Sequence, residues 1–111
     1  CGIDAPGCMT GVDQSAVWAG ESDSARDHVI VENRHEPTTI HVKTYIDERY
    51  KLTVYYGREY GELFDLRDDP GEVDNLWDNP AFSALKAGLT TKLLFAEMGK
   101  EPLPMPRIWG A

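Results

Sequence analysis

The chain has few cysteines, few basic residues and no long apolar run. Its 111 residues include 2 Cys, and 11 Lys and Arg stand against 19 Asp and Glu, giving a formal net charge of -8. Nucleic acids and anionic membranes reward clustered cations, so neither is an expected partner. No stretch of about 18 apolar residues occurs, which predicts no transmembrane helix. The N-terminus also lacks the basic and apolar regions of a signal peptide.

The cysteines permit only limited inference. Cys1 and Cys8 lie in a segment rich in Gly and Pro, and the sequence leaves a disulfide and two free thiols both open. We infer no compartment from them. The chain starts with Cys rather than Met, so we expect that it was cut from a longer polypeptide.

Hydrophobic periodicity predicts an α+β fold. Four short segments alternate apolar and polar residues or are rich in β-branched residues, and polar or Gly-containing turns separate them. They predict a four-stranded antiparallel meander with strands at about 28–32, 39–46, 50–56 and 62–66. In the second segment, Ile40, Val42 and Ile46 share one face, while His41 and Tyr45 are among the residues of the other. Of the tyrosines that follow, alternation places Tyr50 and Tyr56 in the core.

One C-terminal helix, over about 80–98, should pack across this sheet. Asn79 can accept hydrogen bonds as the N-cap, and Pro80 suits the first helical position. Beyond it, an apolar stripe recurs every three or four residues and should lie on the sheet: Phe82, Leu85, Leu89 and Leu93. A Pro-rich tail follows. Residues 1–27 are predicted to form an irregular arm anchored by Val17 and Trp18. Residues 28–111 form the predicted subdomain.

The segments 49–52 and 61–76, Arg-Tyr-Lys-Leu followed by Gly-Glu-Leu-Phe-Asp-Leu-Arg-Asp-Asp-Pro-Gly-Glu-Val-Asp-Asn-Leu, carry a family resemblance. They resemble the C-terminal signature of type I sulfatases, the arylsulfatase-like branch of the alkaline phosphatase superfamily. Residues 2–6 and the Trp18-Ala19-Gly20-Glu21 segment are also similar to family motifs in the same order. The resemblance implies a non-catalytic C-terminal subdomain whose partner is the sulfatase catalytic domain. The implied parent hydrolyses sulfate esters or sulfamates.

The family's chemistry depends on calcium and on a formylglycine made within a C-x-P-S-R motif. That motif is absent from these 111 residues, so neither Cys1 nor Cys8 is carried over as nucleophile. No catalytic residue and no metal ligand is therefore assigned, and no cofactor is expected in this chain. The acidic stretch 65–74 lacks the order of an EF-hand loop. We interpret Asp68-Asp69-Pro70-Gly71 as a turn in which Gly71 supplies a positive φ.

Arg34 and His35 are the candidate residues for a substrate cleft. They are expected in the loop after the first strand, where a guanidinium and an imidazole suit an anionic sulfate or sugar, although a solvated charged loop explains them equally simply. Arg49 and Lys51 are interpreted as structural, ion-paired residues.

Two other functions remain open beside the sulfatase hypothesis. A stand-alone interaction or glycan-binding module would use the same sheet or the tail. In the sulfatase hypothesis, exposed apolar surface on the isolated subdomain would make it a possible homo-oligomer. An independent hydrolase using His35 with Asp47 or Glu36 is disfavoured, because no motif places a nucleophile beside a base.

Overall fold

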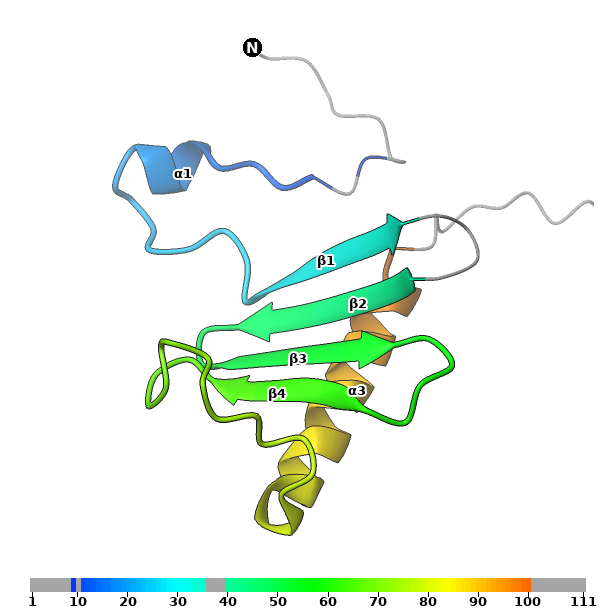
Figure 1. The fold of residues 1–111 in the computed structure, drawn as a ribbon. Helices are drawn as coiled ribbons and strands as arrows, with labels where there is room; N and C mark the ends of the chain where they lie inside the picture. The colour runs from blue at the N-terminus through cyan, green and yellow to red at the C-terminus, as the bar shows by residue number, and fades with distance from the viewer. Residues whose placement is uncertain (1–8, 10, 36–39, 101–111) are drawn as a thin grey trace, which may run out of the picture.

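The structure, a computed structural model, describes residues 9, 11–35 and 40–100. Its centre is a four-stranded antiparallel sheet in the order β1-β2-β3-β4 (Figure 1). The strands are β1 (His28–His35), β2 (Ile40–Asp47), β3 (Tyr50–Tyr55) and β4 (Gly61–Asp65). One long helix, α3 (Ser83–Met98), crosses one face of the sheet. The predicted α+β meander with a C-terminal helix is confirmed. The Pro-rich tail and both cysteines lie outside the described residues.

Several element boundaries differ from expectation. β1 extends to His35, beyond the expected end at 32, because residues 32–35 contain no Gly or Pro and continue to pair with β2. β3 ends at Tyr55 and β4 begins at Gly61, each one residue early. The helical segment starts with the 3-10 turn η1 (Pro80–Phe82) before α3.

Local side-chain bonds explain where the turns and the helix begin. At the β2–β3 turn, Asp47 Oδ1 accepts from the amides of Arg49 (3.0 Å) and Tyr50 (2.8 Å). Asn79 Oδ1 accepts from the amide of Ala81 at 3.0 Å, as expected for an N-cap that Pro80 follows. Both signals are local, which is why the sequence alone locates them.

The core lies between the sheet and α3. Leu52 of β3 and Leu63 of β4 are fully buried, and Leu89 and Leu93 on α3 pack against them together with Tyr45. The predicted apolar stripe of the helix is therefore confirmed. The helix covers the face of β2 that carries Tyr45 and leaves the Ile40 face open.

One core assignment is wrong. Tyr50 packs against the core, but the Tyr56 side chain is 80% exposed. Tyr56 lies one residue beyond the end of β3, so the alternation continues past the strand without burial.

The outer edge of β4 is closed by the segment after it. The Asn75 side chain accepts from the Leu63 amide (3.0 Å) and donates to the Gly61 carbonyl (3.0 Å), while the Leu76 amide donates to the Leu63 carbonyl (2.8 Å). The Trp77 ring lies so close to Gly61 that a β-carbon there would approach it to 2.5 Å. These groups occupy the hydrogen-bonding positions that another strand would need.

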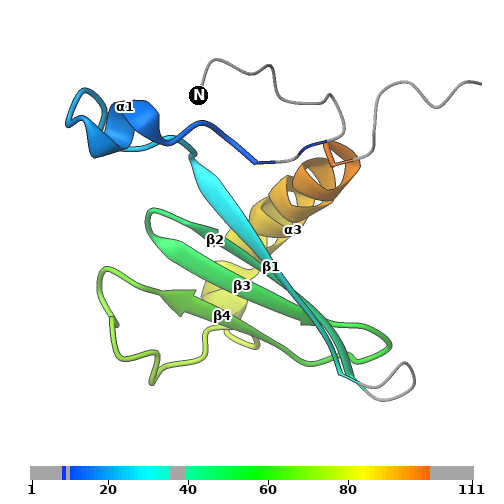
Figure 2. The ribbon, with the colours of Figure 1, turned by 90° about the horizontal axis from the view of Figure 1, so that it is seen from above.

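The N-terminal arm is not entirely irregular. It contains the short helix α1 (Ser15–Trp18), and the described part of the arm runs on the same side of the sheet as α3 (Figure 2). The expected anchor Trp18 is 84% exposed, so it makes no buried contact within the described residues.

Candidate functional site

The two predicted cleft residues lie on strand β1 rather than in a loop. Arg34 is paired with His41 and His35 with Ile40, so both are the last residues of β1. Adjacent strand residues point to opposite faces, so Arg34 and His35 present their side chains on different faces of β1. The predicted loop position is wrong, because β1 is longer than expected.

Arg34 is instead brought together with two residues from β2 and the end of β3. Its Nη2 atom lies 3.4 Å from His41 Nε2, and His41 and Tyr56 have ring centroids 5.7 Å apart at a tilt of 42°. The Tyr56 amide donates to the His41 carbonyl at 2.9 Å. These three residues form a cross-strand row at one end of the sheet, which we call the Arg34–His41–Tyr56 row.

Sequence reasoning missed two members of this row. Alternation places His41 on one face of the second segment without giving it a function, and it places Tyr56 in the core. The signal that could have found them is strand register: the observed pairing of Val42 with Tyr55 places His41 opposite Tyr56. A shallow apolar groove of about 350 Å³ adjoins the row, and its lining residues include Tyr56, Leu93 and Leu94.

The charge of Arg34 is not neutralised by a carboxylate in the part of the chain that the structure describes. Unlike Arg34, two nearby lysines form ion pairs with carboxylates. Lys43 pairs with Glu97 and, at 3.3 Å, with Glu32. Lys100 lies 2.7 Å from an oxygen of each of the same two carboxylates. Hydrogen bonds from Lys100 and Lys43 lower the pKa of Glu32. The lysine network is thus internally compensated, and the guanidinium of Arg34 is left for solvent or a ligand.

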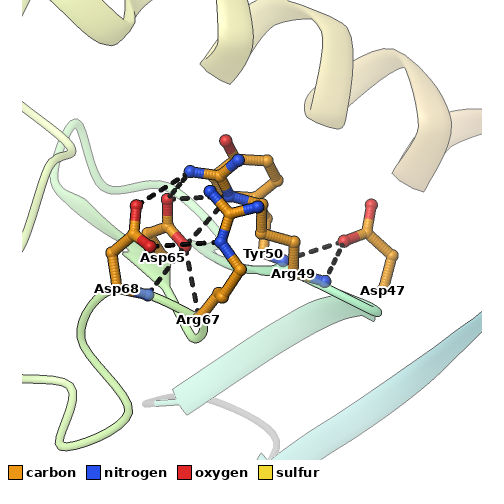
Figure 3. Close-up of polar contacts among 6 residues, drawn as sticks. All are labelled: Asp47, Arg49, Tyr50, Asp65, Arg67 and Asp68. Carbon is orange, nitrogen blue, oxygen red and sulfur yellow. Dashed lines mark hydrogen bonds and ion pairs between the residues drawn. The ribbon is translucent and has the colours of Figure 1, made fainter.

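A second polar cluster surrounds Arg49 (Figure 3). Its Nε and Nη2 atoms hold Asp65 at 2.9 and 2.6 Å, Nη2 also reaches Asp68 at 3.0 Å, and the guanidinium lies 5.0 Å from the Tyr50 ring centroid. Hydrogen bonding from Arg49 lowers the pKa of Asp65. The Asp65 side chain is only 10% exposed, and its ion pair with Arg49 fastens β3 to the end of β4. The structural interpretation of Arg49 agrees with these contacts.

The acidic loop 65–74 does not fit a calcium site. Asp69 Oδ2 accepts from the amides of Val73 and Asp74, both at 2.8 Å, and Glu72 pairs with Lys51 at 2.5 Å. Within residues 9, 11–35 and 40–100, no group of three or more His, Cys, Asp or Glu side chains is arranged to hold a metal. The carboxylates of the acidic loop instead cap a turn and bind cations of the protein, so no chemical step through calcium is assigned to this loop.

The predicted role of Gly71 is wrong. The residue with a left-handed backbone in this turn is Glu72, with φ of 53°, and Gly71 has no positive φ. The Glu72 amide donates to the Asp69 carbonyl at 3.1 Å and its carboxylate binds Lys51, so these contacts hold the unusual conformation in place.

The structure separates His35 from Asp47, one of the two partners considered for an independent hydrolase. His35 pairs with Ile40 at one end of β2, whereas Asp47 pairs with His28 at the other end. Seven residues of extended strand correspond to about 23 Å, too far for these two side chains to act together. Glu36, the other partner considered, lies outside the described residues.

The four-stranded antiparallel sheet crossed by one C-terminal helix is the fold of a sulfatase C-terminal subdomain. Residues 1–98 match the model of the family described as N-sulphoglucosamine sulphohydrolase, C-terminal, and the chain belongs to that family. Among curated proteins, none matches this chain.

Solved structures lead to the same class. The chain is 27% identical to BT1596, a 2-O GAG sulfatase (TM-score 0.77, covering 89% of this chain). It is also 27% identical to a putative sulfatase from Bacteroides thetaiotaomicron VPI-5482 (TM-score 0.79, covering 91%). BT4656, solved with its substrate D-glucosamine-2-N,6-O-disulfate, shares the fold at 17% identity (TM-score 0.77, covering 91%). The chain spans 22% of the length of each of these proteins.

Within the described residues, no helix is both long enough and apolar enough to cross a membrane.

Proposed function

We propose that this chain is the non-catalytic C-terminal part of a sulfatase that hydrolyses sulfate esters or sulfamates. The observation that carries the proposal is the family match over residues 1–98, in a chain that spans 22% of two sulfatase structures to which it is 27% identical. The sequence has no C-x-P-S-R motif. In this proposal the nucleophile and the calcium ligands belong to the catalytic domain, as is general in the family.

The chain packs on that catalytic domain. Support comes from apolar side chains that the subdomain does not cover: Val29 and Val31 of β1 and Ile40 of β2 are each 46 to 48% exposed. Val29 pairs with Ile46 and Val31 with Thr44, so this apolar surface continues along two strands on the face opposite α3. Trp18 on the arm adds a large exposed aromatic group. Apolar groups gathered on one face are typical of a protein interface.

The chain also borders the substrate cleft in this proposal. The Arg34–His41–Tyr56 row supports this role, because it presents an exposed ring and a guanidinium that pairs with no carboxylate of the described residues. Sulfated substrates are anionic, and a guanidinium fork suits an oxyanion.

The same row is the observation that favours the second candidate, a stand-alone glycan-binding module. Such a module would be monomeric and would keep its apolar face protected from a hydrophobic dye. A severed subdomain would bind the dye and associate with itself, so mass by light scattering would rise with concentration.

Two measurements test the leading proposal. Assaying the purified chain with calcium and 4-nitrophenyl sulfate should give no turnover, and any turnover that co-purifies with the chain would overturn the non-catalytic role. Sequencing the coding DNA upstream of the Cys1 codon should reveal an open frame with a C-x-P-S-R or S-x-P-S-R motif. A start codon directly before Cys1 would contradict the proposal and favour the module.

A further inference from the structure

We propose that the Arg34–His41–Tyr56 row binds a sulfated disaccharide, with a sulfate group on Arg34 and a sugar ring against Tyr56. This inference rests on the proposed function for its ligand class, since a sulfatase acts on sulfated compounds. It adds three named residues on this chain that would contact such a ligand.

The sulfate position follows from the charge around Arg34. Most other cations near the sheet are committed to carboxylates: Arg49 to Asp65, Lys51 to Glu72, and Lys43 to Glu97. Arg34 has no such partner in the described part of the chain, and its Nη2 atom contacts the imidazole of His41. A guanidinium presents several N–H donors in a plane, so contact with one ring nitrogen leaves donors for the oxygens of a sulfate.

His41 orients the guanidinium. With Arg34 Nη2 as the donor, His41 Nε2 is the acceptor at 3.4 Å, which places the imidazole proton on Nδ1. His41 is itself held by the pairing of β1 with β2 and by the hydrogen bond from the Tyr56 amide. The cation therefore projects from paired strands, which fix the end of the sheet better than a free loop would.

The sugar position follows from the exposure of Tyr56. Its side chain is 80% exposed although it is a large aromatic group beside a folded sheet. The His41 ring lies behind it at 5.7 Å, and the apolar groove of about 350 Å³ adjoins it. A flat ring held in this way offers an apolar surface to the C–H face of a sugar, and its hydroxyl remains available for hydrogen bonding.

The length of the row suits two sugar units. Arg34, His41 and Tyr56 come from three adjacent strands, and strands in a sheet lie about 4.8 Å apart, so the row spans about 10 Å. A disaccharide can therefore contact Arg34 through its sulfate and Tyr56 through its neighbouring ring. Inorganic sulfate can make only the first of these contacts.

The test is an NMR titration of the 111-residue chain, following backbone amides and the Tyr56 ring. A heparin-derived disaccharide carrying 2-O- and N-sulfates should shift the signals of all three residues, with a Kd on the order of 1 mM for so small a contact. The unsulfated disaccharide should bind at least tenfold more weakly. Inorganic sulfate should shift Arg34 without shifting the Tyr56 ring.

Variants make the test specific. Arg34→Gln and Tyr56→Ala should each raise the Kd for the sulfated disaccharide at least fivefold, and Arg34→Lys should give an intermediate value because it keeps the charge and loses the fork. Arg58→Gln is the matched control, since it removes one exposed positive charge two residues after Tyr56 and should leave the Kd within twofold. All three substituted side chains, Arg34, Tyr56 and Arg58, are exposed, so spectra of the variants should remain those of the folded chain.

Three results would overturn the inference: no shifts with the sulfated disaccharide, equal weakening by Arg34→Gln and Arg58→Gln, or inorganic sulfate binding as tightly as the disaccharide. An upstream sulfatase frame combined with no saccharide binding would remove this site and leave the proposed function standing. Saccharide binding by a chain whose start codon directly precedes Cys1 would overturn the proposed function and leave this binding site standing.

Discussion

Replacing Leu89 by Ala should destabilise the subdomain far more than the same replacement at Leu94. Both residues lie on α3, so the change in helix propensity is the same, but Leu89 is 2% exposed and Leu94 is 55% exposed. Leu89 packs against Leu52 and Leu63 of the sheet, and a buried Leu→Ala change costs about 3 to 5 kcal/mol of unfolding free energy. At Leu94 the expected cost is below about 1 kcal/mol.

The size of the effect makes the comparison decisive. A domain of this size has an unfolding free energy of about 5 to 15 kcal/mol, so Leu89→Ala should remove a large fraction of it. Urea denaturation followed by circular dichroism should show a much lower midpoint with an unchanged m-value. If Leu89→Ala does not fold, Leu89→Met, which nearly preserves volume, should fold and lose less than about 1.5 kcal/mol. Equal losses for the two alanine variants would refute the placement of the core between α3 and the sheet.

Three further predictions follow from local contacts. Gly61→Ala should lower the unfolding free energy measured by urea denaturation by about 1 to 3 kcal/mol, because the new β-carbon would lie 2.7 Å from a backbone oxygen. Gly88→Ala is the control: Gly88 has open space around it, so this change should stabilise α3 by about 0.5 to 1 kcal/mol. An unchanged unfolding free energy for Gly61→Ala would contradict the close packing. Asn75→Ala should cost about 1 to 3 kcal/mol and speed hydrogen exchange at the Leu63 amide, and unchanged exchange there would refute the closed β4 edge. The hydrogen bond from Arg49 lowers the pKa of Asp65, so the stability from this pair is present above pH about 4 and is lost as the pH falls through the folded-state pKa. Asp65→Asn should therefore reduce the pH dependence of the unfolding free energy in the native chain but not in an Arg49→Gln background. Equal reductions in both backgrounds would contradict the pairing.

Features encoded in neighbouring residues could be predicted from the sequence. The stripe containing Leu89 and Leu93 identifies the helix face, and Asn79 followed by Pro80 identifies its start. Alternation in the third segment correctly places Tyr50 against the core. In each case the physical cause lies within a few residues of the feature.

The remaining features depend on contacts between distant segments. Alternation divides β2 into two faces but does not say which face the helix will cover, and Tyr45 is buried because Leu89 and Leu93 lie over it. The pairing of Arg34 with His41 depends on the register of β1 on β2, and a shift of one residue would place Arg34 on the opposite face from His41. No local pattern specifies that register, so the Arg34–His41–Tyr56 row could not be foreseen.

The order of the strands has a consequence for how the chain folds. Each strand pairs with the strand that follows it along the sequence, so the sheet can form one hairpin at a time, without closing a long loop. The core contacts of α3 join residues much farther apart, since Leu89 meets Tyr45 and Leu52. Contacts of short sequence separation favour rapid folding. During synthesis the meander can therefore assemble as it emerges, and docking of α3 completes the core last.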